Sequence, residues 1–174
     1  MDSFTTPHLL AERLAAHHLP DLRRMDSDPE VMAHLGGPRD EAGTRDYLER
    51  NLAHWADHGF GLWVLRAVPS REVVGRACVR HVVVDECDEV EIGYGFLPAY
   101  WGRGWATEIA QACVNLAFTR LDCPSVVGLT RPMNRASQRV LGKVGLVLER
   151  EVQLEGLQHL LFRGRPTDRQ ESKG

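Results

Sequence analysis

The stretch that decides the fold is Glu89–Leu121, EVEIGYGFLPAYWGRGWATEIAQACVNLAFTRL. Polar and apolar residues alternate up to Phe96, which predicts a strand with one buried face. Pro98 ends this strand, because proline has no N–H to donate to a neighbouring strand. From Ala106 onward the apolar residues recur at helical spacing, which predicts an amphipathic helix. The stretch is therefore predicted to form a strand, a loop with two glycines and a long helix.

The loop at 101–106 has the features of an anion-binding site. The first N–H groups of a helix have no partner within the helix, and the helix dipole favours negative charge there. Gly102 and Gly104 have no Cβ, so a ligand can approach the main chain closely, and Arg103 adds a positive charge. The pattern is neither the dinucleotide fingerprint nor a P-loop. A tight strand-to-helix connection without a ligand explains these residues alone equally well.

The run 98–108 resembles the acetyl-CoA loop of the GNAT N-acetyltransferases, in the branch typified by the RimJ/RimL ribosomal-protein acetyltransferases. The superfamily pattern Gln/Arg-x-x-Gly-x-Gly/Ala falls on residues 101–106, with Trp101 where Gln or Arg is usual. This departure keeps the main-chain cradle that the family uses and removes one side-chain donor.

Other blocks of the chain carry the same resemblance. Asn134 and Ser137, followed by Gly142–Leu146, resemble the family's Asn-x-x-Ser and the end of the helix that follows it. The blocks at 6–10 and 28–32 resemble the N-terminal blocks of the RimJ/RimL branch. The resemblance covers nearly the whole chain in order, and the combination is specific although each motif alone is not.

The order of predicted elements indicates an α/β (α+β) fold. Strands are expected around 8–14, where a helix is also possible, and at 62–67, 73–84, 89–96, 125–130, 146–153 and 157–162; helices are expected at 19–25, 28–35, 40–58, from 106 and at 134–143. Antiparallel strands followed by a strand–helix–strand crossover predict a mixed, mostly antiparallel sheet with helices on both faces. The resemblance implies the GNAT fold, a seven-stranded sheet whose fourth and fifth strands splay apart and admit the cofactor.

Composition limits the class of protein. The chain has 174 residues, 43% of them hydrophobic, and a net charge of -3, which fits one domain over 1–165 and a polar, disordered tail over 166–174. The net charge argues against a nucleic-acid partner, and no apolar run is long enough to span a membrane. The absence of a signal peptide, together with four cysteines that form no C-x-x-C pair, predicts a reduced, cytoplasmic protein without a zinc site.

The resemblance implies an N-acetyltransferase that uses acetyl-CoA and needs no metal. The acetyl group would pass directly, in a ternary complex, to a primary amine, which is either a protein N-terminus or a small molecule. A non-catalytic acyl-CoA-binding regulatory module is the alternative. A homodimer is expected only by analogy with the family.

The cofactor is expected to bind main-chain N–H groups. The candidates against its diphosphate are the amides of Arg103, Gly104, Trp105 and Ala106, with the Thr107 hydroxyl. Thr107 could equally be a capping residue, and the Trp105 ring is expected to pack beside the loop. Asn134 is expected to contact the cofactor, cap the following helix, or both. The family has a bulge at the end of the central strand, which assigns the amide of Phe96 or Leu97 to the thioester oxygen.

Three chemical groups are expected to carry the transfer. Glu91 is the first candidate for the base that takes the ammonium proton, with Glu89 on the same face of the strand or a water molecule as alternatives. Many family members protonate the leaving thiolate with a tyrosine at the position of Leu141. Since the tyrosine is absent, the resemblance makes Ser137 the candidate donor. Exposed glutamates and an ordinary helix serine are the plain interpretations.

The acceptor is expected to bind near the first helices and the strand after Gly59. The candidate residues are Phe60, Trp63, Arg76 and Tyr94, with His81 and Trp101 as further possibilities. For any one of them a place in the core or on the surface is the more common outcome.

Overall fold

The computed structural model describes residues 2–166, so the predicted tail lies, from residue 167 on, outside the described residues. Contacts divide the chain into two compact units: the first is Met1–Cys78 with Tyr94–Ala106, and the second is Val79–Gly93 with Thr107–Gly174. Two strands, β4 (Val73–Val84) and β5 (Cys87–Phe96), run through both units. The single domain over 1–165 stays a prediction.

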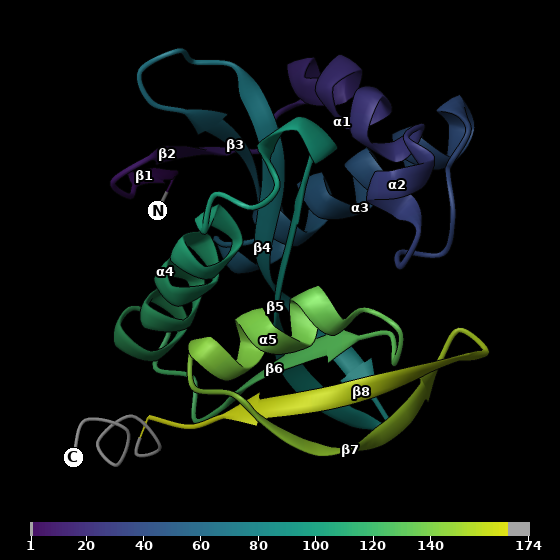
Figure 1. The fold of residues 1–174 in the computed structure, drawn as a ribbon, viewed down its shortest axis with the longest axis vertical. Helices are drawn as coiled ribbons and strands as arrows, with labels where there is room; N and C mark the ends of the chain where they lie inside the picture. Colours follow the sequence, from purple (N-terminus) through teal and green to yellow (C-terminus); the bar gives the residue numbers. More distant parts are fainter. Residues whose placement is uncertain (1, 167–174) are drawn as a thin grey trace. The chain divides into compact units, whose positions relative to one another are not determined.

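The first unit contains an antiparallel sheet and the N-terminal helices (Figure 1). Its strands are β1 (Ser3–Thr5), β2 (Leu9–Arg13), β3 (Leu62–Ala67), the first half of β4 and the end of β5. Its helices are the 3₁₀ turns η1 (Ala16–His18) and η2 (Pro98–Tyr100), α1 (Leu19–Asp26), α2 (Pro29–Met32) and α3 (Glu41–His58). The helices begin where predicted, because Asp28 and Asp40 accept N–H groups of the first turns of α2 and α3.

Tryptophans join α3 to the sheet of the first unit. The ring of Trp55, on α3, packs edge-on against Trp63 of β3 with 5.3 Å between centroids. The Trp55 indole N–H donates to the Leu62 carbonyl at 2.8 Å. Phe4 packs against the same Trp63 ring, again edge-on. Trp63 is completely buried and is the largest fully buried side chain of the described residues.

The second unit contains the rest of β4 and β5 and the C-terminal elements. These are α4 (Trp105–Thr119), whose first two residues belong to the first unit, β6 (Val126–Thr130), α5 (Arg135–Lys143), β7 (Val147–Leu154) and β8 (Leu157–Gly164). β5 and β6 pair in parallel at Glu91 and Val127, whereas β6 with β8 and β7 with β8 are antiparallel. The core contains Val84, Val127, Val152 and Leu161.

Hydrogen bonding orders the strands β1-β2-β3-β4-β5-β6-β8-β7. The predicted mixed, mostly antiparallel sheet with one parallel pair is confirmed. The predicted number of seven strands is wrong, since the described residues form eight. The additional strand is β1, which has three residues and is too short to show an alternating pattern. No helix among residues 2–166 is both long and apolar enough to cross a membrane.

Candidate active site

The predicted site residues fall in both units. In the first unit lie Phe60, Trp63, Arg76, Tyr94, Phe96, Leu97, Arg103, Gly104, Trp105 and Ala106. In the second unit lie Glu91, Thr107, Asn134 and Ser137.

The loop before α4 presents a row of open main-chain N–H groups. Gly102 and Gly104 have φ angles of 75° and 77°, in the left-handed region that favours glycine. A Cβ added to either glycine would meet no atom within 4 Å, so the space beside both is open. Within residues 2–166, the N–H groups of 102–106 donate to no carbonyl or side chain. The loop therefore has the open main-chain N–H groups that the predicted anion cradle requires, and the cradle itself stays a prediction.

Aromatic side chains brace this loop. The Trp101 indole N–H donates to the Phe96 carbonyl at 2.8 Å, so the residue at the family's Gln or Arg position ties the loop to the end of β5. The Trp105 ring stacks on Tyr100 with 5.9 Å between centroids, as expected for packing beside the loop. The Arg103 guanidinium lies 5.4 Å from the centre of the Tyr100 ring and 5.2 Å from that of Trp105. These side-chain contacts fix the position of the loop without using its main-chain N–H groups, which stay available to a ligand.

The main chain at the end of β5 places the two predicted donors to the thioester oxygen in different surroundings. The Leu97 N–H donates to the Val74 carbonyl of β4 at 2.9 Å, so the assignment of Leu97 is corrected. In an antiparallel pair, N–H groups of successive residues point to opposite edges, which directs that of Phe96 away from β4. Val74 and Leu97, which this bond joins, lie equally far along their strands from the turn at 85–86. The pairing of β4 with β5 therefore has no net shift in register between the turn and Leu97.

A glycine that sequence reasoning missed permits this arrangement. Gly75, on β4, faces Gly95 and Phe96, and a Cβ at this position would overlap the Gly95 carbonyl. The two strands can approach only because Gly75 has no side chain. An isolated glycine within a predicted strand was the signal for a close main-chain approach.

The two candidate bases on β5 both contact arginine, in different ways. Glu91 is 8% exposed. Its Oε2 accepts a hydrogen bond from Nε of Arg80 at 2.7 Å, whereas its Oε1 has no hydrogen-bond partner within residues 2–166. Glu89 accepts hydrogen bonds from both terminal nitrogens of Arg163, at 2.6 and 2.8 Å, so both carboxylate oxygens of Glu89 are occupied. The hydrogen bonds that Arg163 donates to Glu89 raise the pKa of Arg163 above its usual range. Of the two glutamates, only Glu91 has a carboxylate oxygen without a hydrogen-bond partner within residues 2–166, and this oxygen could accept a proton.

The first turn of α5 holds the next two candidates. The Asn134 side-chain oxygen accepts the Ser137 N–H at 3.1 Å, so the predicted capping role of Asn134 is confirmed. Ser137 is half-buried. Leu141, at the position of the family's tyrosine, is 2% exposed and fills the space that Gly128 of β6 leaves open. That position therefore belongs to the core of the second unit.

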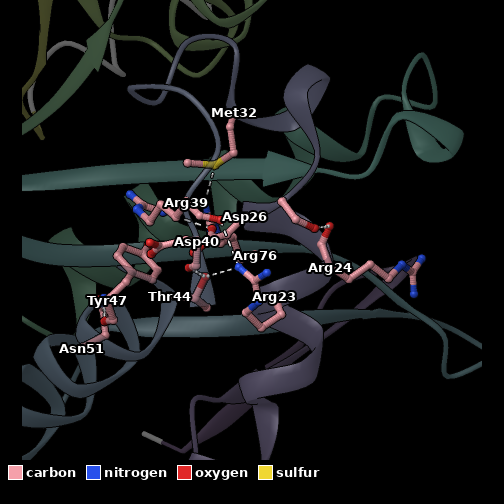
Figure 2. A network of polar contacts seen from close by, with 11 residues as sticks. Arg23, Arg24, Asp26, Met32, Arg39, Asp40, Thr44, Tyr47, Asn51 and Arg76 are labelled. Atoms are coloured by element: carbon pink, nitrogen blue, oxygen red, sulfur yellow. Dashed lines mark hydrogen bonds and ion pairs between the residues drawn. The ribbon is translucent and has the colours of Figure 1, made fainter. Parts of the chain in front are cut away.

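Two of the four predicted acceptor-binding residues are structural. Trp63 is buried between Phe4 and Trp55, as described above, because β3 presents it to the core. Arg76 is 5% exposed and donates to Oδ1 of the fully buried Asp26 at 2.6 Å (Figure 2). Both assignments are corrected.

Figure 2 shows the network that occupies Arg76. Its second terminal nitrogen lies 3.5 Å from the Met32 sulfur, and its guanidinium lies 4.9 Å from the centre of the Tyr47 ring. Arg39 donates to the same Asp26 oxygen at 3.0 Å. Burial lowers the pKa of Arg76, but Tyr47 and Asp26 together outweigh it, so the pKa lies above its usual value. The network joins α1, α2, α3 and β4, and a sequence shows no sign of such long-range pairing.

Phe60 and Tyr94 remain candidates for the acceptor site. Both are half-buried. Phe60 packs edge-on against His54 of α3 with 5.3 Å between ring centroids. Neither side chain is fully buried, so both keep some surface toward solvent.

One group of side chains among the described residues has the spacing of metal ligands. Atoms of Glu12, His17 and His18 lie within 4.8 Å of one another. The Ala15 N–H donates to Nδ1 of His18, so the neutral ring carries its proton on Nε2, which lies 3.4 Å from Glu12. That nitrogen has no lone pair to offer, and a hydrogen bond from Arg66 lowers the pKa of Glu12 and occupies its carboxylate. The group is an internal polar contact.

Comparison with known proteins gives consistent results. A family model described as an acetyltransferase (GNAT) domain matches residues 8–147. The chain is 31% identical over 120 residues to the uncharacterized protein YkkB of Bacillus subtilis, across 69% of this chain and 70% of that protein. It is 33% identical over 143 residues to an FsC-acetyl coenzyme A-N(2)-transacetylase of Aspergillus fumigatus, across 76% of this chain and 60% of that protein.

A solved structure shares the fold over nearly the whole chain. The acetyltransferase from Agrobacterium tumefaciens superposes with a TM-score of 0.84 and 26% sequence identity, and the match covers 95% of each chain.

Proposed function

This chain belongs to the GNAT acetyltransferase family, and we propose that it transfers the acetyl group of acetyl-CoA directly to a primary amine in a ternary complex. Acetyltransferases of this family are enzymes that use acetyl-CoA and act on amines. The observation that carries the proposal is the set of open N–H groups at 102–106. Acetyl-CoA would supply a diphosphate for these groups and a thioester for the reaction.

The loop before α4 fits a diphosphate by charge and by space. Main-chain N–H groups at a helix start point outward and favour an anion. Gly102 and Gly104 leave room for phosphate oxygens, because neither position has an atom near a would-be Cβ. We assign the amides of Arg103, Gly104 and the first residues of α4 to this role, with the Thr107 hydroxyl.

We assign one role in the transfer to each remaining group. The Phe96 N–H donates to the oxygen on which negative charge develops. Oε1 of Glu91 accepts the proton that the acceptor ammonium loses, directly or through a water molecule. The amine nitrogen would bond to the thioester carbon, and the C–S bond would break as the Ser137 hydroxyl gives its proton to the sulfur. Ser137 would then take up the proton that the new amide nitrogen releases, while Asn134 orients the cofactor and its side-chain oxygen caps α5. None of these steps requires a metal.

The acceptor is proposed to be a protein N-terminus or a small-molecule amine. The order of the motifs at 6–10, 28–32, 98–108 and 134–146 supports a RimJ/RimL-type enzyme, which favours a polypeptide acceptor. The name of the Aspergillus relative, an N(2)-transacetylase, supports transfer to nitrogen. We retain Phe60 and Tyr94 as candidates for the acceptor site.

We propose that the protein works in the cytoplasm and can form a homodimer. The cysteines Cys78, Cys87, Cys113 and Cys123 form no disulfide, which suits a reducing compartment. β7 ends the order of strands, and Val147 and Leu148 on it are 66% and 51% exposed. An edge strand with exposed apolar residues is a surface on which a second copy could pair.

An acyl-CoA-binding module without turnover is the second candidate. The observation that favours it is Leu141, which is buried where many family members have a catalytic tyrosine. The two candidates differ in what they release, because only an enzyme produces free CoA in proportion to the amine consumed.

The test is release of free thiol from acetyl-CoA with a panel of amines: peptides with free N-termini, a polyamine, an amino acid and an aminoglycoside. The enzyme predicts steady thiol release with at least one amine and an acetylated product by mass spectrometry. Tight binding of acetyl-CoA without release for any amine would favour the module. Absence of binding would contradict both.

A further inference from the structure

We infer that the outer face of α5 docks an acidic polypeptide segment. Arg135, Arg139 and Lys143 lie four residues apart on this helix, and all three are exposed. We call these three side chains the basic ridge. Residues four apart lie on one face of a helix, and this face is opposite Leu141, which holds α5 on β6 (Figure 1).

Within residues 79–93 and 107–166, no acidic side chain pairs with the basic ridge. α5 contains no acidic residue. In the part of the chain that the structure describes, no side chain of the ridge forms an ion pair or hydrogen bond. Two arginines on strands of the second unit behave differently, since Arg150 and Arg163 both pair with carboxylates.

The ridge also opposes the stability of its own helix. Like charges four residues apart repel each other. Arg135 stands in the first turn, where the helix dipole disfavours a positive charge. Only Lys143, in the last turn, is favoured by the dipole. Three aligned cations that the fold neither pairs nor prefers are suited to a partner that brings negative charge.

The dimensions and the overall charge favour a polypeptide as this partner. At a rise of about 1.5 Å per residue, the ridge is about 12 Å long with a cation roughly every 6 Å. Carboxylates four residues apart on an acidic helix have the same spacing. The whole chain has a net charge of -3 and a sequence pI near 6.2, whereas nucleic-acid-binding domains carry a basic excess and neutralise several phosphates.

The inference deepens the proposed function and rests on it, because the acceptor would be an acidic protein. Exposed charge pairs add little affinity each but steer encounter and orient the partner. The ridge would therefore lower KM for an acidic protein acceptor and leave kcat, and KM for a short neutral peptide, unchanged.

Binding is tested without acetyl-CoA, so that the outcome does not depend on catalysis. The probe is fluorescent poly-L-glutamate, measured by anisotropy at low salt. The variant Arg135→Gln, Arg139→Gln, Lys143→Gln removes the ridge. The control Arg24→Gln, Arg50→Gln, Arg120→Gln removes the same charge from exposed positions on α1, on α3 and after α4. We expect about tenfold weaker binding for the ridge variant, less than about twofold for the control, and loss of the difference at high salt.

Two results would overturn the inference. One is equal weakening by the ridge variant and the control, which would mean that only net charge matters. The other is tighter binding of single-stranded poly(U) RNA than of poly-L-glutamate, if the RNA binding is lost in the ridge variant. That result would make the surface a nucleic-acid site.

A second arm separates this inference from the proposed function. Thiol release with a short neutral peptide should be the same for the wild type and the ridge variant. With an acidic protein acceptor, KM should rise about tenfold for the ridge variant alone. If no amine is acetylated at all, the proposed function fails while the binding arm still decides whether the ridge docks an acidic chain.

Discussion

Helices α4 and α5 both follow a strand and a short loop, yet they begin differently. At the start of α4 the N–H groups of 102–106 have no acceptor within residues 2–166, and two left-handed glycines keep the space beside them open. At the start of α5 the Asn134 side chain accepts the Ser137 N–H. A strand, a loop and a helix therefore do not suffice for an anion site. The residues before the helix decide whether its first N–H groups serve the fold or a ligand.

The same contrast divides the two glutamates of β5. Both oxygens of Glu89 are bonded to Arg163, whereas Glu91 contacts Arg80 through one oxygen only. We interpret the satisfied N–H groups and carboxylate oxygens as structural and the open ones as functional. Substitution of an open group should therefore change activity, and substitution of a satisfied group should change stability.

The largest effect is expected for Glu91→Gln. Loss of the base should reduce kcat by about 10²- to 10³-fold at neutral pH, because positioned proton transfer contributes on that scale. Glu89→Gln should lower stability, since it weakens the bond to Arg163, but change kcat by less than about threefold. Turnover and thermal unfolding of both variants check this. Undiminished turnover in Glu91→Gln would remove Glu91 from the mechanism.

The next effect is expected for Gly104→Val. A β-branched residue at a φ of 77° strains the main chain and places a side chain in the cradle. The affinity for acetyl-CoA should fall about 10- to 100-fold, which corresponds to the free energy of one lost hydrogen bond to a charged group.

Gly156→Val is the matched control for this change. Gly156, in the turn between β7 and β8, has a φ of 75° and also has no atom near a would-be Cβ. It should show the same strain in thermal unfolding and bind acetyl-CoA as the wild type does. Equal losses of affinity in both variants, measured by calorimetry, would mean that strain rather than the cradle is responsible.

A smaller effect is expected for Ser137→Ala. Without the hydroxyl, the departing sulfur loses its proton donor, and kcat should fall about tenfold, while the affinity for acetyl-CoA stays unchanged. Ser137→Thr keeps a hydroxyl and should recover most of the rate. Steady-state thiol release measures both variants, and full activity in Ser137→Ala would return this residue to an ordinary place in the helix.

The smallest effect is expected at the satisfied helix end. Asn134→Ala should reduce the free energy of unfolding by about 1 kcal/mol, the usual value of a lost N-cap. Asn134→Asp keeps the acceptor oxygen and should restore stability. It removes the side-chain N–H₂ group, so weaker acetyl-CoA binding in a stable Asn134→Asp would support the second role of Asn134. Denaturant unfolding and calorimetry separate the two roles.

The sequence was most informative where a local pattern determines the structure. The helix predicted from 106 is α4. Its predicted apolar stripe is buried at Ile109, Ala110, Cys113, Leu116 and Ala117, whereas Ala106 in the first turn is half-buried. The strand predicted to end before Pro98 ends at Phe96, and Asn134 caps α5 as expected. Each of these features depends on residues within a few positions of each other, so a sequence contains the required information.

The errors arose where the structure depends on distant partners. Arg76 was assigned to the acceptor site, but Asp26, fifty positions earlier in the chain, holds it in the core. Leu97 lost its assigned role because its N–H pairs with Val74 on the neighbouring strand. A sequence shows that such a group can form a hydrogen bond, but not which partner the fold brings to it.

The central claim is that main-chain N–H groups before α4 bind the diphosphate of acetyl-CoA. It is tested most directly by ¹H–¹⁵N correlation spectra of the protein during titration with acetyl-CoA. The account predicts that the largest shifts fall on the amides of 102–106. The Gly43 amide, which is bonded to Asp40 at the start of α3, should remain unchanged. Saturable binding of acetyl-CoA without a change in the chemical shifts of the amides of 102–106 would contradict the account.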